Sequence, residues 1–253
     1  MKTAFFCLAL YFMPLQADEI FGGIKVNATK YPFIARLFIP ISGGNGLTCT
    51  GSLVTKDLIL TAKHCFEYGG VRYKTGKATF NDTSRKKDKD EFSVSIKLFK
   101  EYPNSDLALA KLTEEVQSIT PVRINKKKIK PGMSVRTVGY GMNGPFFEKD
   151  NFDGHLRDID LQVSYVKGVW IGTKVGKNME GPCAGDSGGP LLVESPYGWS
   201  VVAALFGAGY DCRTHTVNGD DRWSSVRALD YNDLGGDDDY YDYYRDYDDG
   251  QGH

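Results

Sequence analysis

The sequence lacks the features that would place it in a membrane, around a zinc ion or in an alternating α/β fold. Its early apolar stretch, residues 4–13, is far shorter than the roughly 20 residues that a spanning helix needs, and Pro14 interrupts it. No Cys-x-x-Cys spacing occurs, so the cysteines do not indicate a zinc site. Long amphipathic helical patterns are also missing, which disfavours a βαβ fold with its regular crossover helices.

The first residues indicate export. Lys2 precedes the apolar stretch, and Leu15-Gln16-Ala17 places a small residue at a suitable cleavage point, as in secretory signal peptides. We therefore predict a signal peptide at 1–17. The mature protein is expected to be secreted, either extracellular or in a secretory granule, without a membrane anchor.

The cysteines are few, and their number fits an exported protein. Of the five, Cys7 falls in the predicted signal peptide. The remaining four can pair completely in any of three connectivities, and an oxidising compartment favours disulfides over metal ligation. No metal is predicted. The four are Cys49, Cys65, Cys183 and Cys212.

Short apolar runs separated by Gly, Asn and Pro dominate the rest of the chain. Such runs, rich in Val, Ile, Phe and Leu, are typical of strands. They predict an all-β protein, built as a barrel or a sandwich. The runs are 33–39, 51–60, 92–99, 134–138 and 199–206.

The charged segments are expected to lie at the surface. Residues 85–89 and 123–130 are basic and are interpreted as solvated loops rather than as sites for heparin or nucleic acid. Residues 235–253 hold seven aspartates, one arginine and five tyrosines, and such a segment cannot bury a core, so we expect a disordered tail. Its charge of −6 leaves about +5 on the rest of the chain, so it could contact a basic face or a basic protein. Tyrosine sulfation of the tail is a further hypothesis.

Two N-glycosylation sequons gain weight from the predicted export. Asn27-Ala28-Thr29 and Asn81-Asp82-Thr83 have the Asn-x-Thr pattern. Each predicts an exposed loop that carries a glycan at Asn27 or Asn81.

The strongest chemical signal is a serine inside a run of glycines, Gly185-Asp186-Ser187-Gly188-Gly189-Pro190. Glycines let backbone N–H groups converge beside the hydroxyl, as a developing oxyanion requires. Ser187 is therefore the candidate nucleophile, with the N–H groups of Gly185 and Ser187 as the oxyanion hole. An incidental serine in a glycine turn is the alternative.

Serine needs a base, and the chain has only four histidines. His253 is terminal, and His155 and His215 lie in polar surroundings. His64 directly follows an apolar run and precedes Cys65, which could staple the turn. His64 is therefore the candidate base.

The acid that orients the base is assigned to Asp106. It opens the apolar segment 107–112, which would hold a carboxylate at the rim of a core. An aspartate before a strand is usually a turn residue, so this assignment depends on the other two.

These three segments, in the order His, Asp, Ser, resemble the trypsin and chymotrypsin family of serine proteases. Further similarities are Ile20-Phe21-Gly22-Gly23, Pro32-Phe33, Gly139-Tyr140-Gly141 and Phe206-Gly207. The resemblance implies two six-stranded antiparallel β-barrels with the triad at their junction, a short C-terminal helix, and a protease domain at 20–234. It also implies the disulfides Cys49–Cys65 and Cys183–Cys212.

The resemblance implies that the protein is made as a zymogen. In the family, a freed N-terminal ammonium pairs with the aspartate before the nucleophile, here Ile20 with Asp186. Asp18-Glu19 precedes Ile20 without a Lys or Arg for a trypsin-like activator. This dipeptide resembles that of granule-stored leukocyte and mast-cell proteases, which implies removal by a dipeptidyl peptidase.

The sequence leaves two alternatives for the substrate residue preferred before the scissile bond. The family's basic-specific members carry an aspartate six residues before the nucleophile, and here that position is Gly181. A neutral pocket lined by Phe206 and Gly207 would favour large apolar side chains. Asp220 or Asp221 could instead supply a charge from the opposite wall.

Two further positions bear on the prediction of the substrate pocket. Gly219 fills the place of the charged residue if two residues are inserted after it. Leu205 stands where the family usually has a serine, and the family's usual third disulfide is missing.

The function predicted is peptide-bond hydrolysis through an acyl-enzyme, without a cofactor, by a monomer acting on protein or peptide substrates. One alternative is an inactive protease homologue that acts as a secreted binding or regulatory protein, although such chains usually lose a triad residue. In a second alternative, the basic loops and the acidic tail carry the main function, and proteolysis is incidental. Neither nucleic acid nor membrane is an expected partner.

Overall fold

The computed structural model describes residue 20 and residues 22–82, 91–103, 105–125, 128–143, 152–167, 170–174 and 180–206. The predicted signal peptide at 1–17, the dipeptide at 18–19, the C-terminal helix and the tail at 235–253 lie outside the described residues. Within those ranges no helix is long and apolar enough to cross a membrane.

Six strands of the first half close into a barrel in the order β2-β3-β4-β9-β8-β7. Side chains on β8 alternate between exposed and buried from 93 to 97, because successive residues of a strand point to opposite faces. The strands are β2 (Ile34–Pro40), β3 (Gly46–Leu53), β4 (Leu58–Ala62), β7 (Thr75–Phe80), β8 (Phe92–Glu101) and β9 (Leu107–Leu112).

The second half of the fold is a seven-stranded sheet with the order β1-β12-β11-β14-β15-β10, in which β13 also pairs with β12 and the N-terminal β1 supplies one edge. One pair, β10 with β15, is parallel, which departs from the antiparallel expectation. The remaining pairs of this sheet are antiparallel. The strands are β1 (Ile24–Lys25), β10 (Arg123–Ile124), β11 (Ser134–Gly139), β12 (Arg157–Lys167), β13 (Trp170–Lys174), β14 (Pro190–Ser195) and β15 (Gly198–Ala204).

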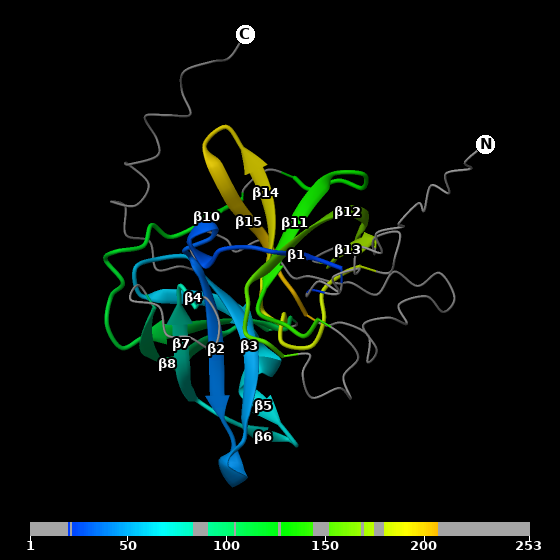
Figure 1. The fold of residues 1–253 in the computed structure, drawn as a ribbon. Coiled ribbons are helices and arrows are strands. Elements are labelled where there is room, and N and C mark those ends of the chain that lie inside the picture. Colours follow the sequence, from blue (N-terminus) through cyan, green and yellow to red (C-terminus); the bar gives the residue numbers. More distant parts are fainter. Residues whose placement is uncertain are drawn as a thin grey trace, which may run out of the picture.

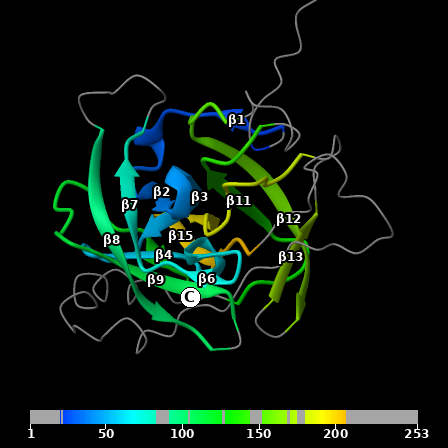
Figure 2. The ribbon, with the colours of Figure 1, turned by 90° about the horizontal axis from the view of Figure 1, so that it is seen from below.

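The helical elements of the described ranges are three short 3-10 turns, so the all-β prediction is confirmed. They are η1 (Ala28–Lys30), η2 (Ser42–Gly44) and η3 (Lys63–Phe66), and η3 leads into a small hairpin of β5 (Glu67–Tyr68) and β6 (Val71–Arg72). Figures 1 and 2 show the barrel, mostly blue to teal, on one side and the second sheet, mostly green to yellow, on the other.

Two predicted segments differ in detail from the structure. The apolar run at 51–60 contains the end of β3, a turn and the start of β4; within that turn, the Thr55 hydroxyl donates to Asp57 Oδ1 (2.9 Å). The basic stretch at 123–130 is not all loop, because half-buried Arg123 and Ile124 form β10.

Each half has its own apolar core, and the larger core extends across the junction between them. Fully buried side chains of the first half include Leu37, Ile59 and Phe80. The second core contains Val135, Leu161 and Leu191. Burying one such side chain stabilises the fold by about 1.5–3 kcal/mol, so the two halves are held by many independent contributions.

Candidate active site

His64 and Asp106 form the best-defined polar pair at the junction. His64 Nδ1 lies 2.5 Å from Asp106 Oδ2, and the backbone N–H of His64 donates to Asp106 Oδ1 (2.9 Å). The carboxylate is 9% exposed, whereas the imidazole is 40% exposed. Both carboxylate oxygens are therefore engaged by one residue, which fixes the ring and directs its other nitrogen outward.

The position of His64 follows from the elements around it. β4 is buried along its whole length and ends at Ala62, so η3 begins at the barrel rim. Cys65, inside η3, forms a disulfide with Cys49 of β3 (S–S 2.03 Å). The carbonyl of Asp106 accepts the backbone N–H of Lys63 (2.5 Å), which ties the two segments together.

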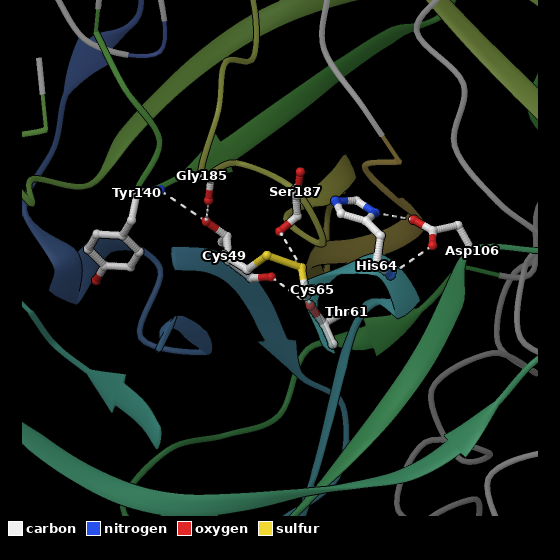
Figure 3. Close-up of a disulfide and its surroundings, with 9 residues drawn as sticks. Cys49, Thr61, His64, Cys65, Asp106, Tyr140, Gly185 and Ser187 are labelled. Atoms are coloured by element: carbon white, nitrogen blue, oxygen red, sulfur yellow. Dashed lines mark hydrogen bonds and ion pairs between the residues drawn. A yellow bond between two sulfur atoms is a disulfide. The ribbon is translucent and has the colours of Figure 1, made fainter. Parts of the chain in front are cut away.

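Ser187 lies on the other side of the imidazole. Figure 3 shows the ring of His64 between Asp106 and Ser187, with its second nitrogen facing the serine side chain. Ser187 comes from the second half, and its carbonyl accepts the N–H of Thr50 from β3 (2.9 Å). The structure thus brings together the three residues that the sequence suggested.

The glycines around Ser187 permit this approach of the two halves. Gly188 has φ of +79°, and a Cβ there would collide with Thr61, Thr50 and Ala62 of the first barrel. A Cβ at Gly189 would meet carbonyl oxygens of Asp186 and Val138 at 2.8 and 2.9 Å. Only glycine fits at both places, so the glycine run is required for docking as well as for loop conformation.

Two backbone donors of this loop are left available. The N–H groups of Asp186, Gly188 and Gly189 all donate to backbone carbonyls. In the described part of the chain, those of Gly185 and Ser187 have no acceptor. These are the two groups assigned by the sequence to an oxyanion hole.

Thr50 organises the loop and was not identified from the sequence. It is fully buried. Its hydroxyl donates to the carbonyl of Gly185 (2.9 Å) and accepts the N–H of Tyr140 (3.1 Å). No local sequence signal marks this role, because both partners are distant in the chain.

Asp186 is a buried carboxylate held by two backbone donors. Its Oδ1 accepts from Gly141 N (2.7 Å) and its Oδ2 from Cys183 N (2.8 Å). Burial raises the pKa of Asp186 to about 7, and the two donors and the charge of Arg157 oppose that rise only in part. Such a carboxylate would be stabilised in its charged form by a nearby cation.

Ile20 is also buried, at 0% exposure, and has φ of +43°. That torsion is unfavourable for a β-branched residue. In the intact chain the Ile20 nitrogen is an amide, so an ion pair with Asp186 requires prior cleavage.

The candidate substrate pocket is described only in part. Gly181 is buried, and half-exposed Phe206 packs edge-on against His64 with 6.2 Å between ring centroids. Gly207, Asp220 and Asp221 lie outside the described residues. Cys183 is disulfide-bonded, and its predicted partner Cys212 lies outside the described residues as well.

The two sequon asparagines have different surroundings. Asn27 is exposed, and its Oδ1 accepts from both the backbone N–H and the hydroxyl of Thr29 (3.0 and 2.9 Å). Both bonds are made to the oxygen, so the amide nitrogen of Asn27 takes no part in them. Asn81 is half-buried at the end of β7 and has φ of +53°.

The site offers little to a metal ion. Across the described ranges, one group of potential ligands is close enough, Cys49, His64 and Cys65. Its two sulfurs form the disulfide and are not thiolates, which are the form that binds metals.

Comparison with known proteins agrees with this geometry. The human heparin binding protein has a similar structure, with a TM-score of 0.63 and 20% identity over 82% of this chain and 91% of that one, which shows the fold alone. Mast cell protease 3 from Ovis aries is 27% identical over 205 residues, which cover 71% of this chain and 77% of that protein. Chymase from Mus musculus is 28% identical over 200 residues, covering 70% and 77%, respectively.

An insect protein matches over a longer stretch of the chain. Phenoloxidase-activating enzyme 1 from Spodoptera litura is 26% identical over 252 residues, covering 83% of this chain and 63% of that protein. The trypsin family model matches residues 20–219. The chain therefore belongs to the trypsin family.

Proposed function

We propose that this protein is a secreted serine endopeptidase in which His64, Asp106 and Ser187 form the catalytic triad. The observation that carries the proposal is the pairing of His64 with buried Asp106 beside Ser187. The family supplies the reaction class, and the retained residues favour an active enzyme over a homologue without catalysis.

The chemistry follows from the positions of these groups. The second ring nitrogen of His64 accepts the proton of Ser187 Oγ while that oxygen attacks the carbonyl carbon of the peptide bond. Asp106 holds the ring in one tautomer and stabilises the imidazolium that forms. The imidazolium then gives its proton to the leaving amine, and the acyl group stays on Ser187 until water removes it by the same steps.

The N–H groups of Gly185 and Ser187 are assigned to stabilise the developing oxyanion by hydrogen bonds. Both groups lack acceptors among the described residues, so no existing bond must break when the negative charge appears. Thr50 holds the peptide carbonyl of Gly185 and so fixes the orientation of the loop. Thr50 is a positioning residue because it contacts no reacting atom.

Activation is assigned to cleavage before Ile20, which would leave a protease domain at 20–234. The freed ammonium would supply the cation that buried Asp186 needs. Cleavage also removes the peptide bond that defines the unfavourable φ of Ile20, so the strain is released in the same step. The predicted dipeptide Asp18-Glu19 suits a dipeptidyl peptidase, and terminal sequencing of the active protein should begin at Ile20.

The preferred substrate residue is proposed as large and apolar. Gly181 places no charge at the position used by basic-specific members of the family. Cleavage after Lys or Arg in a peptide library would instead favour a role for Asp220 or Asp221. Cleavage after Phe, Tyr or Leu would support the neutral pocket.

A fluorophosphonate probe tests the enzyme proposal directly. It should label the processed protein at Ser187, and Ser187→Ala should abolish the labelling. The matched control is Ser95→Ala, which removes an exposed serine from the outer face of the first barrel. This variant should be labelled at Ser187 as strongly as the wild type. Equal labelling of the Ser187→Ala protein, or none of the processed wild type, would contradict the proposal.

A further inference from the structure

A line of cationic and aromatic side chains crosses the outer face of the first barrel. It runs over the neighbouring strands β2, β7, β8 and β9. The five exposed residues Phe38, Lys77, Lys97, Lys111 and Phe99 form what we call the lysine stripe.

The strand register places these residues next to one another. Phe38 lies opposite Lys77, and Lys97 lies opposite Lys111. Lys77 faces Ser95, which is two residues from Lys97 on the same face, so the two lysines are diagonal neighbours at roughly 7–8 Å. Four adjacent strands span about 15 Å, which an extended peptide of five to seven residues can cross.

The charges of the stripe are poorly compensated. Lys97 and Lys111 are like charges directly opposite each other, an arrangement that destabilises a sheet. Lys111 pairs with Asp57 (3.1 Å). Among the described residues, Lys77 and Lys97 have no acidic partner.

One exposed aromatic ring lies at the β2 end of the stripe, and a second lies on β8 beside Lys111. Phe38 is 45% exposed and Phe99 57% exposed. The Lys111 ammonium lies 5.6 Å from the Phe99 ring centroid. A partner that fits the stripe should therefore combine closely spaced carboxylates with aromatic rings.

The chain itself contains a segment of that composition. Residues 237–249 hold seven aspartates and five tyrosines, arranged so that acidic and aromatic side chains are interspersed. We propose that this acidic segment binds the lysine stripe of its own chain. Carboxylates would neutralise the opposed lysines while tyrosine rings pack against Phe38 and Phe99.

Chain length and tethering favour this occupant. The described chain ends at Phe206, and Asp237 follows 31 positions later, so about 100 Å is the upper limit of the distance between them. A tethered ligand meets its site at an effective concentration in the millimolar range, which lets weak electrostatic contacts be occupied. The proposal concerns a surface away from the triad and does not depend on the protease activity.

Zero-length carbodiimide coupling of the full chain tests the contact. Coupling joins carboxylates to amines that touch, and peptide mass spectrometry identifies the pairs. Aspartates of 237–249 should be joined to Lys77, Lys97 and Lys111 at low salt. These crosslinks should disappear in 1 M NaCl, where the screening length is about 3 Å rather than about 30 Å at 0.01 M.

Matched lysines on the second sheet provide the control. Lys25, Lys167 and Lys174 are exposed and lie on β1, β12 and β13. Equal coupling of the acidic segment to these residues would overturn the proposal. Coupling found only between chains of an isotopically mixed sample would also overturn it, because a second copy would then be the occupant.

A binding measurement gives an independent readout. In one variant, the seven aspartates of 237–249 become asparagine, which should free the stripe. That variant should bind a fluorescent peptide of residues 235–253 at least tenfold more tightly than the wild type, whose own segment competes. Adding Lys77→Gln, Lys97→Gln and Lys111→Gln should abolish this binding, while glutamine at the three control lysines should not. Equal binding by wild type and variant would contradict the proposal.

Discussion

The buried carboxylate of Asp186 should make the unprocessed chain lose stability as the pH rises. Its pKa is raised from 3.8 to about 7, mainly by burial. The folded chain therefore holds a proton that the unfolded chain releases between about pH 4 and pH 7. The stabilisation is fully present below pH 4 and is lost as the pH rises through the folded pKa.

The magnitude follows from that difference. At about 1.4 kcal/mol for each pH unit, this one group should lower the free energy of unfolding by up to about 4 kcal/mol between pH 4 and pH 8. Asp186→Asn keeps the size of the side chain but cannot ionise. The difference in stability between the wild type and the Asn variant should therefore depend on pH.

Urea unfolding of residues 18–253 at pH 4, 5, 6, 7 and 8 measures this difference, with Ser187→Ala in both proteins to prevent self-cleavage. Comparison of the two proteins cancels the titration of all other groups that do not contact Asp186. Parallel pH profiles would refute the reasoning. After cleavage before Ile20, the new ammonium should flatten the wild-type profile, and the same assay on the processed protein checks this.

Three substitutions test the rest of the site. Thr50→Val removes the hydroxyl bonded to Gly185, so kcat should fall by roughly tenfold or more with little change in KM, and Thr50→Ser should restore it; an unchanged kcat would exclude the positioning role. Gly188→Ala introduces a Cβ at a positive φ against the first barrel, and urea unfolding should show a loss of at least about 2 kcal/mol. Asp106→Asn keeps a bond to the His64 backbone but favours the wrong tautomer, so kcat should fall about 10⁴-fold in an ester assay. A loss below tenfold would contradict the assigned role.

The sequence suggested those parts of the candidate site that carry a local signal. The glycine run around Ser187 and the His64-Cys65 pair each combine an unusual composition with a neighbouring apolar run, so they could be found without structural information. Asp106 needed its companions, because an aspartate before a strand has no distinctive local pattern. Thr50 could not be found at all, since its role depends on Gly185, 135 positions away.

The fold was predictable where one strand face meets solvent. β8 alternates between buried and exposed residues, and its span was close to the predicted run. β4 is buried on both faces, so its apolar residues merge with those of β3 and the turn between them was missed. Register and barrel closure depend on pairing between distant strands, which composition does not encode.

In the proposed mechanism, the triad is divided between two halves, so hydrolysis would depend on how those halves are aligned. His64 and Asp106 belong to the first half, Ser187 belongs to the second, and Gly188 lies where the two halves meet. A small shift at this contact would separate the Ser187 hydroxyl from the His64 imidazole while leaving each half internally intact. A displacement far smaller than unfolding would therefore be enough to stop the proposed reaction, without any change to the three groups assigned to it.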